Sequence, residues 1–157
     1  MALKAKLLTL QSALQRGRKY CAYQERSQQE VRDKFYELGL HRNEVEQGIA
    51  LLIEEGYLNE QRFAIAYAGG KFRIRKWGRV KIRLALKEKK VSEACIKAAL
   101  NETPGKDYEQ SLKKVIAEKK KKLSGQPSQK MNYQLAQYAI SRGYEPDLVW
   151  ETLKMND

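Results

Sequence analysis

The stretch VRDKFYELGLHRNEVEQGI, residues 31–49, contains a spacing pattern that occurs three times in this chain. Ile82 follows Val31 by 51 residues, and Leu135 follows Ile82 by 53. Repetition at such a period is typical of proteins built from stacked helical units, which offer a long surface to a large partner more often than a pocket to a small molecule. The three copies comprise Val31, Phe35, Gly39, Leu40, Val45 and Ile49; Ile82, Leu86, Lys90, Val91, Ile96 and Leu100; and Leu135, Ala139, Gly143, Tyr144, Val149 and Leu153.

Each copy predicts two short helices joined by a tight turn. Apolar steps of four residues place both members of a pair on one helical face. Gly39 and Gly143 stand where the first helix must end, because glycine adopts a left-handed conformation without steric cost. Lys90 occupies this place in the second copy, so we expect a slightly strained turn there. The second helix of each copy is predicted to start at His41, Ser92 or Glu145.

A further helix is expected before each copy, which gives three helices per unit. The first of these is predicted over Leu3 to Gln24. Ser27 with Glu30 forms a capping box for the helix that follows. The second starts after Asn59 and passes through Gly69-Gly70, where we expect a bend or close contact with a neighbouring helix. The third opens at Asp107, with Gln110 completing another capping box.

These patterns predict an all-α chain of three tandem three-helix repeats in an elongated, curved array. The expected units are residues 1–56, 57–103 and 104–157. A chain of 157 residues can bury enough surface for stable cores, and the 42% apolar and 32% charged composition suits thin helical layers. The chain lacks long alternating runs of β-branched residues.

The net charge of +12 favours a polyanionic partner such as nucleic acid or an acidic protein groove. The charge is unevenly distributed. Residues 71–90 hold ten Lys or Arg against one Glu, whereas residues 25–60 hold nine acidic residues against four basic ones. The two regions are therefore expected to meet different surfaces. Because the basic field repels itself, we expect a monomer.

No segment is apolar enough to span a membrane, and the N-terminus lacks the apolar core of a secretory signal, so a cytoplasmic location is predicted. Cys21 and Cys95 share no motif, and both are expected to be buried free thiols. A single histidine, His41, and two scattered cysteines make neither a nucleophile triad nor a zinc site. We therefore expect no enzyme activity, no cofactor and no metal.

The junction between the first two copies reads GYLNEQRFA at residues 56–64, and KWGRVKIRLAL follows at residues 76–86. These segments resemble the RecX family of bacterial regulators of the RecA recombinase, as does the stretch YCAYQERS at residues 20–27. The resemblance covers residues 18–100, and the last third agrees only through the repeat spacing. The chain departs from the family pattern at Arg79, Ala85 and Lys90, which affects turn geometry and local charge.

The resemblance implies a non-catalytic protein that lies in the groove of the RecA filament on single-stranded DNA and depresses its ATPase and strand-exchange activities. This implied role belongs to DNA repair, homologous recombination and the SOS response. The alternative is a free-standing basic helical protein that binds single- or double-stranded nucleic acid through its phosphates.

The densest basic segment supplies the candidate contacts to a partner or to DNA. A solvated helix face is the other interpretation of such a charge run. Arg62 is ambiguous between a structural ion pair and a partner contact, and Trp77 between stacking on a base and packing between units. The candidates are Arg62, Lys71, Arg73, Arg75, Lys76, Arg79, Lys81 and Arg83.

The remaining residues of the family motif are predicted to be structural, because they would end a helix, cap the next one or fill the junction between units. They are Gly56, Tyr57, Leu58, Asn59, Phe63, Ala64, Tyr67, Trp77, Gly78, Ile82 and Leu86. The lysine run 119–122 is interpreted as a solvated helix end.

Overall fold

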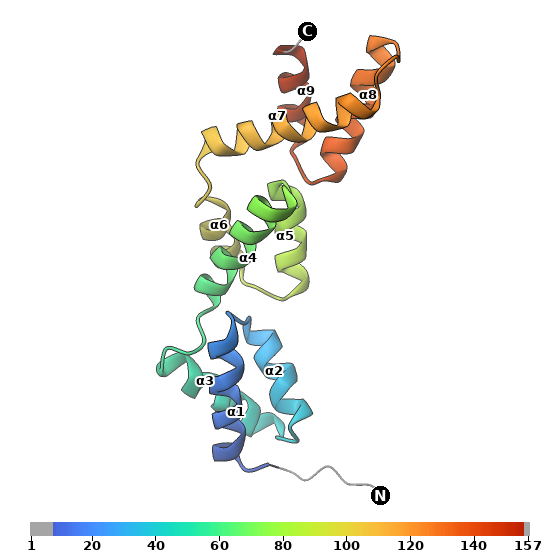
Figure 1. Cartoon of the computed structure of the whole chain (residues 1–157). Coiled ribbons are helices and arrows are strands. Elements are labelled where there is room, and N and C mark those ends of the chain that lie inside the picture. Colours follow the sequence, from blue (N-terminus) through green and yellow to red (C-terminus); the bar gives the residue numbers. More distant parts are fainter. Residues whose placement is uncertain (1–7, 156–157) are drawn as a thin grey trace, which may run out of the picture.

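The computed structural model describes residues 8–155, and every helix or strand within this range is an α-helix (Figure 1). The helices form three groups of three: α1–α3 are the first repeat, α4–α6 the second and α7–α9 the third. This arrangement confirms the predicted all-α tandem repeat. The bounds are α1 Leu10–Tyr23, α2 Gln28–Glu37, α3 Arg42–Glu54, α4 Glu60–Arg75, α5 Arg79–Glu88, α6 Glu93–Leu100, α7 Gly105–Lys122, α8 Ser128–Ser141 and α9 Pro146–Met155.

The repeated spacing pattern corresponds to three separate hydrophobic cores. All five apolar positions of each copy are buried. In the first repeat they surround Phe35, in the second they surround Leu86, and in the third they surround Tyr144. Each helix triplet therefore buries its own apolar face, which is why the pattern recurs once per repeat.

The turn inside each copy has the same hydrogen bond in all three repeats. The backbone N–H groups of Leu40, Val91 and Tyr144 donate to carbonyls five residues earlier, at 3.1, 3.1 and 3.2 Å. This bond closes a helix whose last residue is left-handed. The left-handed residue is glycine in two copies but Lys90 in the second, with φ 62°. The predicted strain at Lys90 is therefore present and costs about 1 kcal/mol relative to glycine.

Several predicted helix starts are confirmed. Ser27 accepts the N–H of Glu30 at 3.0 Å, and the Glu30 carboxylate accepts the N–H of Ser27 at 2.9 Å. Asn59 caps α4 by accepting the N–H of Arg62. Ser92 caps α6, and α9 begins at Pro146.

Two predicted starts are wrong. α1 begins at Leu10 and not at Leu3, because Thr9 has an extended backbone and caps the helix by accepting the N–H of Ser12. Leu3 itself lies outside the described residues. α7 begins at Gly105 after Pro104, so Asp107 lies inside the first turn and forms no capping box. Pro104 determines where α7 begins, because a proline disfavours the helical conformation in the residue before it.

The glycine pair in α4 makes no close contact with a neighbouring helix, which was one of its two expected roles. The other expected role, a bend, stays a prediction. α4 continues through Gly69 and Gly70, and nothing lies within 4 Å of a Cβ placed on Gly70. At Gly69 the nearest atoms are those of the Arg73 guanidinium on the same helix, so no neighbouring helix makes close contact there. The prediction for Cys95 is wrong: Cys21 is buried, but Cys95 is only half-buried, and both thiols are free.

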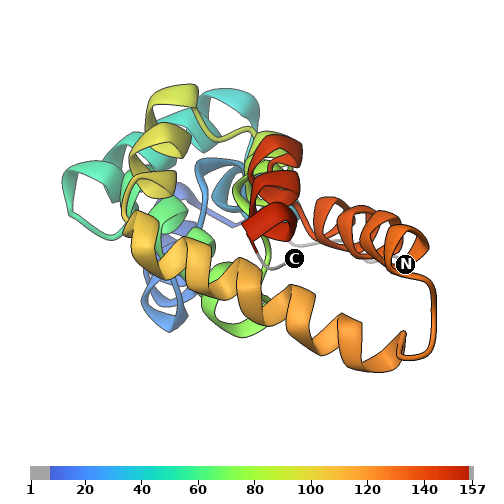
Figure 2. The same cartoon turned by 90° about the horizontal axis from the view of Figure 1, so that it is seen from above.

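The three repeats stack along one long axis, with α1–α3 at one end of the molecule and α7–α9 at the other (Figure 1). α7 runs across this axis, and Figure 2 shows α7 and α8 extending beyond the outline of the other repeats. The boundaries proposed at residues 56/57 and 103/104 stay predictions. Leu58, on the second side of the first boundary, packs in the core of the first repeat.

Candidate protein-binding surface

The first part of the family motif forms the passage from the first repeat to the second. Gly56 has φ 82° and follows α3, and the N–H of Leu58 donates to the carbonyl of Leu52. Leu58 is buried in the first core, whereas Phe63 and Ala64 are buried in the second. Tyr57 is 38% exposed, and Tyr67 is half-buried beside the Phe63 ring.

The second part of the motif, from Trp77 to Leu86, starts α5. Ile82 and Leu86 belong to the second core, and Trp77 packs at its edge. The Nζ atoms of Lys71 and Lys81 lie 5.0 and 4.7 Å from the centre of the Trp77 ring. Trp77 thus holds two of the candidate cations through cation–π contacts.

Gly78 joins the second repeat to the third through backbone contacts. Its N–H donates to the carbonyl of Arg142 at 2.8 Å, and the N–H of Val80 donates to the carbonyl of Gly143 at 2.9 Å. A Cβ on Gly78 would lie 2.3 Å from the carbonyl carbon and oxygen of Gly143. Only a glycine lets the two turns approach this closely.

Two buried tyrosines of the third repeat complete this junction. The Tyr108 hydroxyl accepts the N–H of Arg79 and donates to the Glu145 carboxylate. The Tyr144 hydroxyl donates to the carbonyl of Lys76 at 3.0 Å. Burial raises the pKa of the Tyr108 phenol far above its usual value, and the hydrogen bond to Glu145 raises it further. The junction is therefore a rigid network of polar groups that satisfy one another.

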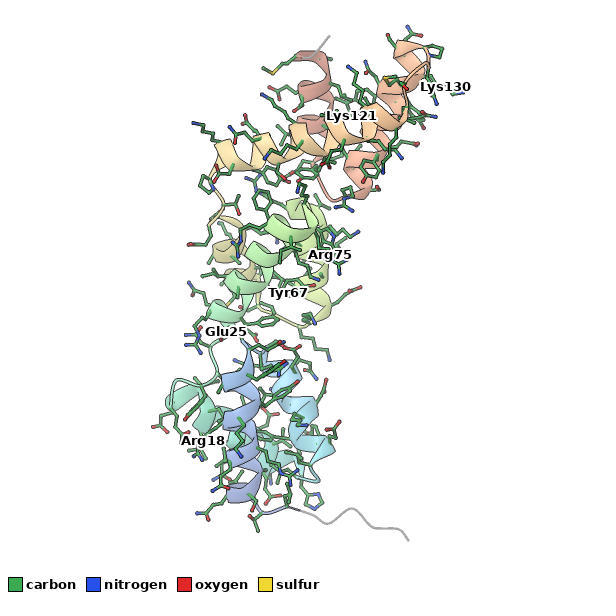
Figure 3. All side chains as sticks on the ribbon, viewed as in Figure 1. Arg18, Glu25, Tyr67, Arg75, Lys121 and Lys130 are labelled. Carbon is green, nitrogen blue, oxygen red and sulfur yellow. The ribbon has the colours of Figure 1, made fainter. Side chains whose placement is uncertain are left out.

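Side-chain contacts dominate the junction between the first and second repeats. Arg62 pairs with Glu25, which lies between these two repeats in Figure 3, and donates to the carbonyls of Gly56 and Tyr57. The Glu60 carboxylate accepts the N–H of Gln28 at 2.7 Å. Arg62 thus has structural partners for its Nε and Nη2 atoms.

The structure separates the other seven candidate cations by their surroundings. Arg79 pairs with Glu145 and stacks on the Tyr108 ring, with its guanidinium carbon 3.7 Å from the ring centre. Arg83 pairs with Glu93. Lys71 and Lys81 lie over Trp77, as described above.

Three cations remain, which we call the basic turn: Arg73, Arg75 and Lys76. Within the described part of the chain, none of them forms an ion pair. Arg73 and Arg75 are exposed in the last turn of α4, and Lys76 follows as its left-handed C-cap with φ 56°. Arg75 lies near the upper end of the second repeat in Figure 3. The exposed hydrophobic side chains nearest in sequence are Ile74 and Val80, which are 79% and 43% exposed.

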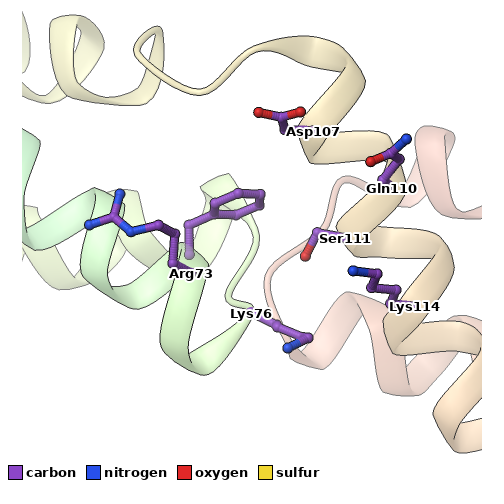
Figure 4. A pocket seen from close by; sticks show the side chains of 7 residues that line it. Arg73, Lys76, Asp107, Gln110, Ser111 and Lys114 are labelled. Carbon is purple, nitrogen blue, oxygen red and sulfur yellow. The ribbon is translucent and has the colours of Figure 1, made fainter.

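Sequence reasoning did not identify the residues that face the basic turn across the junction. A cavity of about 270 Å³ separates the end of α4 from α7 (Figure 4). We call it the junction cleft. No spacing signal connects these two segments, because they meet only through the docking of the second and third repeats. The lining residues are Phe72, Arg73, Lys76, Asp107, Gln110, Ser111 and Lys114.

Other kinds of site have little support in this structure. Among residues 8–155, no group of three His, Cys, Asp or Glu side chains is arranged to hold a metal ion. No helix in that range has the length and apolar content needed to cross a bilayer. His41 is exposed at the start of α3.

The fold and this surface define a tandem helical-repeat protein with exposed cations on its middle repeat. Residues 59–100 match the family model described as RecX, second three-helix domain. The chain thus contains a domain of the RecX family.

Its relatives include proteins named regulatory protein RecX. One from Clostridium perfringens strain 13 is 31% identical over 124 residues, covering 78% of this chain and 58% of the relative. One from Bacillus mycoides is 24% identical over 140 residues, covering 89% of this chain and 52% of the relative. The chain therefore spans little more than half the length of these relatives.

Solved structures show the same fold. The crystal structure of RecX from Lactobacillus salivarius superposes with a TM-score of 0.87 at 19% identity, covering 93% of this chain and 95% of that one. A second crystal structure, of a regulatory protein RecX, gives a TM-score of 0.84 at 21% identity and covers 93% and 71%. This agreement supports the tandem three-helix repeat.

Proposed function

We propose that this protein regulates the RecA recombinase by binding its filament on single-stranded DNA, and that it lowers ATPase and strand-exchange activity without catalysing a reaction. The domain of the RecX family supports the choice of partner. The observation that carries the mode of action is the basic turn: three neighbouring cations, two of them exposed, that have no ion-pair partner in the described chain. Such cations are available to an acidic surface at little desolvation cost.

The mechanism is steric and electrostatic. An elongated array can follow a filament groove and contact neighbouring protomers, with the basic turn facing the filament. Bridging protomers in this way would restrict the subunit motion that accompanies ATP hydrolysis and would hinder entry of a second DNA. The rigid junction between the second and third repeats favours this role, since a preorganised surface loses less entropy on binding.

A charge-reversal variant tests the proposal. The triple change Arg73→Glu, Arg75→Glu and Lys76→Glu should abolish inhibition of the DNA-dependent ATPase of the recombinase from the same source. A matched control reverses three lysines of α7, Lys119, Lys120 and Lys121, which carry the same charge at a helix end. Unchanged inhibition by the folded basic-turn variant would contradict the proposed contact.

Salt titration separates this function from free-standing nucleic-acid binding. Phosphate contacts on single strands weaken with a log–log slope of roughly −0.7 per contact. Under the proposed function, tight association requires the recombinase. Equally tight binding to naked DNA, lost with this slope, would favour the alternative.

A further inference from the structure

The junction cleft joins cations of two repeats around one space. Lys76 lies at the end of α4, and Lys114 reaches toward it from α7, as Figure 4 shows. Arg73 also lines the cleft, although its guanidinium folds back along α4. None of the three forms an ion pair with a described carboxylate, and Asp107 is the only acidic residue in the lining. The cleft therefore carries excess positive charge.

The backbone holds Lys76 in a left-handed conformation at the end of α4. Its φ of 56° is a left-handed conformation that glycine or asparagine would adopt at lower cost. A lysine there costs about 1–2 kcal/mol, as it does at Lys90, where the same conformation follows α5. The conformation is fixed from outside, since the Tyr144 hydroxyl holds the Lys76 carbonyl.

Two of the other lining residues make contacts that hold them in place. Phe72 stacks on Tyr108 with ring centres 6.0 Å apart, and the Ser111 and Tyr144 hydroxyls are 2.9 Å apart. Gln110 adds an amide beside these groups. The cleft thus offers an aromatic wall, hydrogen-bonding groups and two lysines within a rigid frame.

We propose that the junction cleft binds the carboxylate of an acidic side chain in a peptide segment of a protein partner. A glutamate or aspartate would place its methylene stem on Phe72 and its carboxylate between Lys76 and Lys114. A nucleic-acid phosphate suits the cleft less well, because it has no apolar stem of its own and is part of a chain that needs a continuous track. The inference deepens the proposed function and rests on it, in that the acidic segment would belong to the regulated recombinase.

Lys76 and Lys90 both have a left-handed backbone, so one can be changed as the test and the other as its control. Lys76→Asn and Lys90→Asn each remove one positive charge from a residue with φ near 60°, and asparagine tolerates that backbone. Only Lys76 lines the cleft. The probe is a fluorescein-labelled peptide of alternating Glu and Gly, whose affinity for the full chain is measured by anisotropy. We expect Lys76→Asn to weaken binding roughly tenfold and Lys90→Asn to change it less than twofold, since a charge-assisted hydrogen bond is lost in the first only.

A second pair lies on α7. Lys114→Gln should weaken peptide binding roughly tenfold, whereas Lys113→Gln should not, because Lys113 lies beside Ile116 and Leu153 around a different cavity. A labelled single-stranded oligothymidylate serves as the second probe. The proposal is overturned if both members of either pair weaken peptide binding equally, if no variant weakens it, or if Lys76→Asn and Lys114→Gln selectively weaken oligothymidylate binding instead.

This experiment is independent of recombinase activity. Peptide binding that depends on Lys76 and Lys114 supports the cleft even if the protein leaves the recombinase ATPase unchanged, which would contradict only the proposed function. Inhibition of the ATPase by variants that no longer bind the peptide would show that the acidic segment bound in the cleft does not belong to the recombinase, and would leave the proposed function standing.

Discussion

Gly78 and Gly143 touch through their backbones, although they belong to different repeats and lie 65 positions apart in the sequence. The N–H of Val80 donates to the Gly143 carbonyl, and that of Gly78 donates to the neighbouring Arg142 carbonyl. Gly143 also ends the first helix of its pattern with φ 103°. Gly143 thus closes its own turn, and Gly78 lacks the Cβ that would prevent that turn from approaching. Because the basic turn directly precedes Trp77 and Gly78, these contacts with the third repeat hold it in place.

The first prediction is that Gly78→Ala loosens the junction between the second and third repeats. The added Cβ would overlap backbone atoms that have no freedom to move, and overpacking of this kind costs roughly 1–3 kcal/mol. Urea unfolding measures the loss. Hydrogen exchange at the Val80 amide should become faster in the variant, because its acceptor moves away.

Gly70→Ala is the control for that change. It lies inside α4 with open space around the new Cβ, so it should stabilise the protein by about 0.5–1 kcal/mol. Equal effects of the two substitutions would show that the contact with Gly143 does not restrain the junction.

The second prediction concerns alkaline pH. The pKa of Tyr108 is raised in the folded protein, which therefore holds the phenolic proton more tightly than the unfolded chain does. The associated stability is complete below the ordinary phenol pKa of 10.0 and is lost as the pH rises above it. The urea midpoint of the wild type should fall more steeply above this pH than that of Tyr108→Phe.

The same variant has an effect at neutral pH. Tyr108→Phe leaves the N–H of Arg79 and the Glu145 carboxylate without their shared partner, which should cost about 1–3 kcal/mol. If the urea midpoint of Tyr108→Phe falls with pH in parallel with that of the wild type, Tyr108 is not the group whose titration lowers stability. Tyr144, whose pKa burial also raises, should retain part of the alkaline loss.

The third prediction addresses the junction between the first and second repeats. The side chains of Arg62 and Glu25 are 46% and 31% exposed, so a double-mutant cycle with Arg62→Gln and Glu25→Gln should give a coupling of about 0.2–1 kcal/mol that declines with added salt. Arg62→Gln alone should cost more than Glu25→Gln, because Arg62 also donates to two backbone carbonyls. The reverse order would contradict this account of Arg62.

The fourth prediction tests the independence of the repeats. Phe35 is fully buried against Gly17 and Gly48, so Phe35→Ala should cost about 3–5 kcal/mol. Because each repeat has its own core, hydrogen exchange should accelerate in α1–α3 much more than in α7–α9. Tyr36→Ala, at the neighbouring 45% exposed position, should change stability by less than about 0.5 kcal/mol. Uniform acceleration along the chain would mean that the three cores unfold as one.

The sequence predicted the features that depend on neighbours along the chain. The buried positions of each copy, the left-handed turns and the caps at Ser27, Asn59 and Ser92 all follow from local patterns. The errors arose where two local signals competed. At Asp107 a capping-box spacing was preferred to Pro104, which precedes the actual helix start. At Gly69-Gly70 low helix propensity suggested a bend or a close contact, and the close contact with a neighbouring helix is absent.

The sequence by itself determined three helical cores and a dense run of positive charge after Gly70, because helical periodicity and charge are written in consecutive residues. Only the tertiary structure decided which of those cations form ion pairs with carboxylates. Glu25, Glu93 and Glu145 neutralise Arg62, Arg83 and Arg79, and each comes from a distant segment or another helix. The docking of the second repeat on the third then placed Lys114 opposite Lys76. Contacts of this kind depend on how whole repeats meet, and no spacing along the chain encodes them.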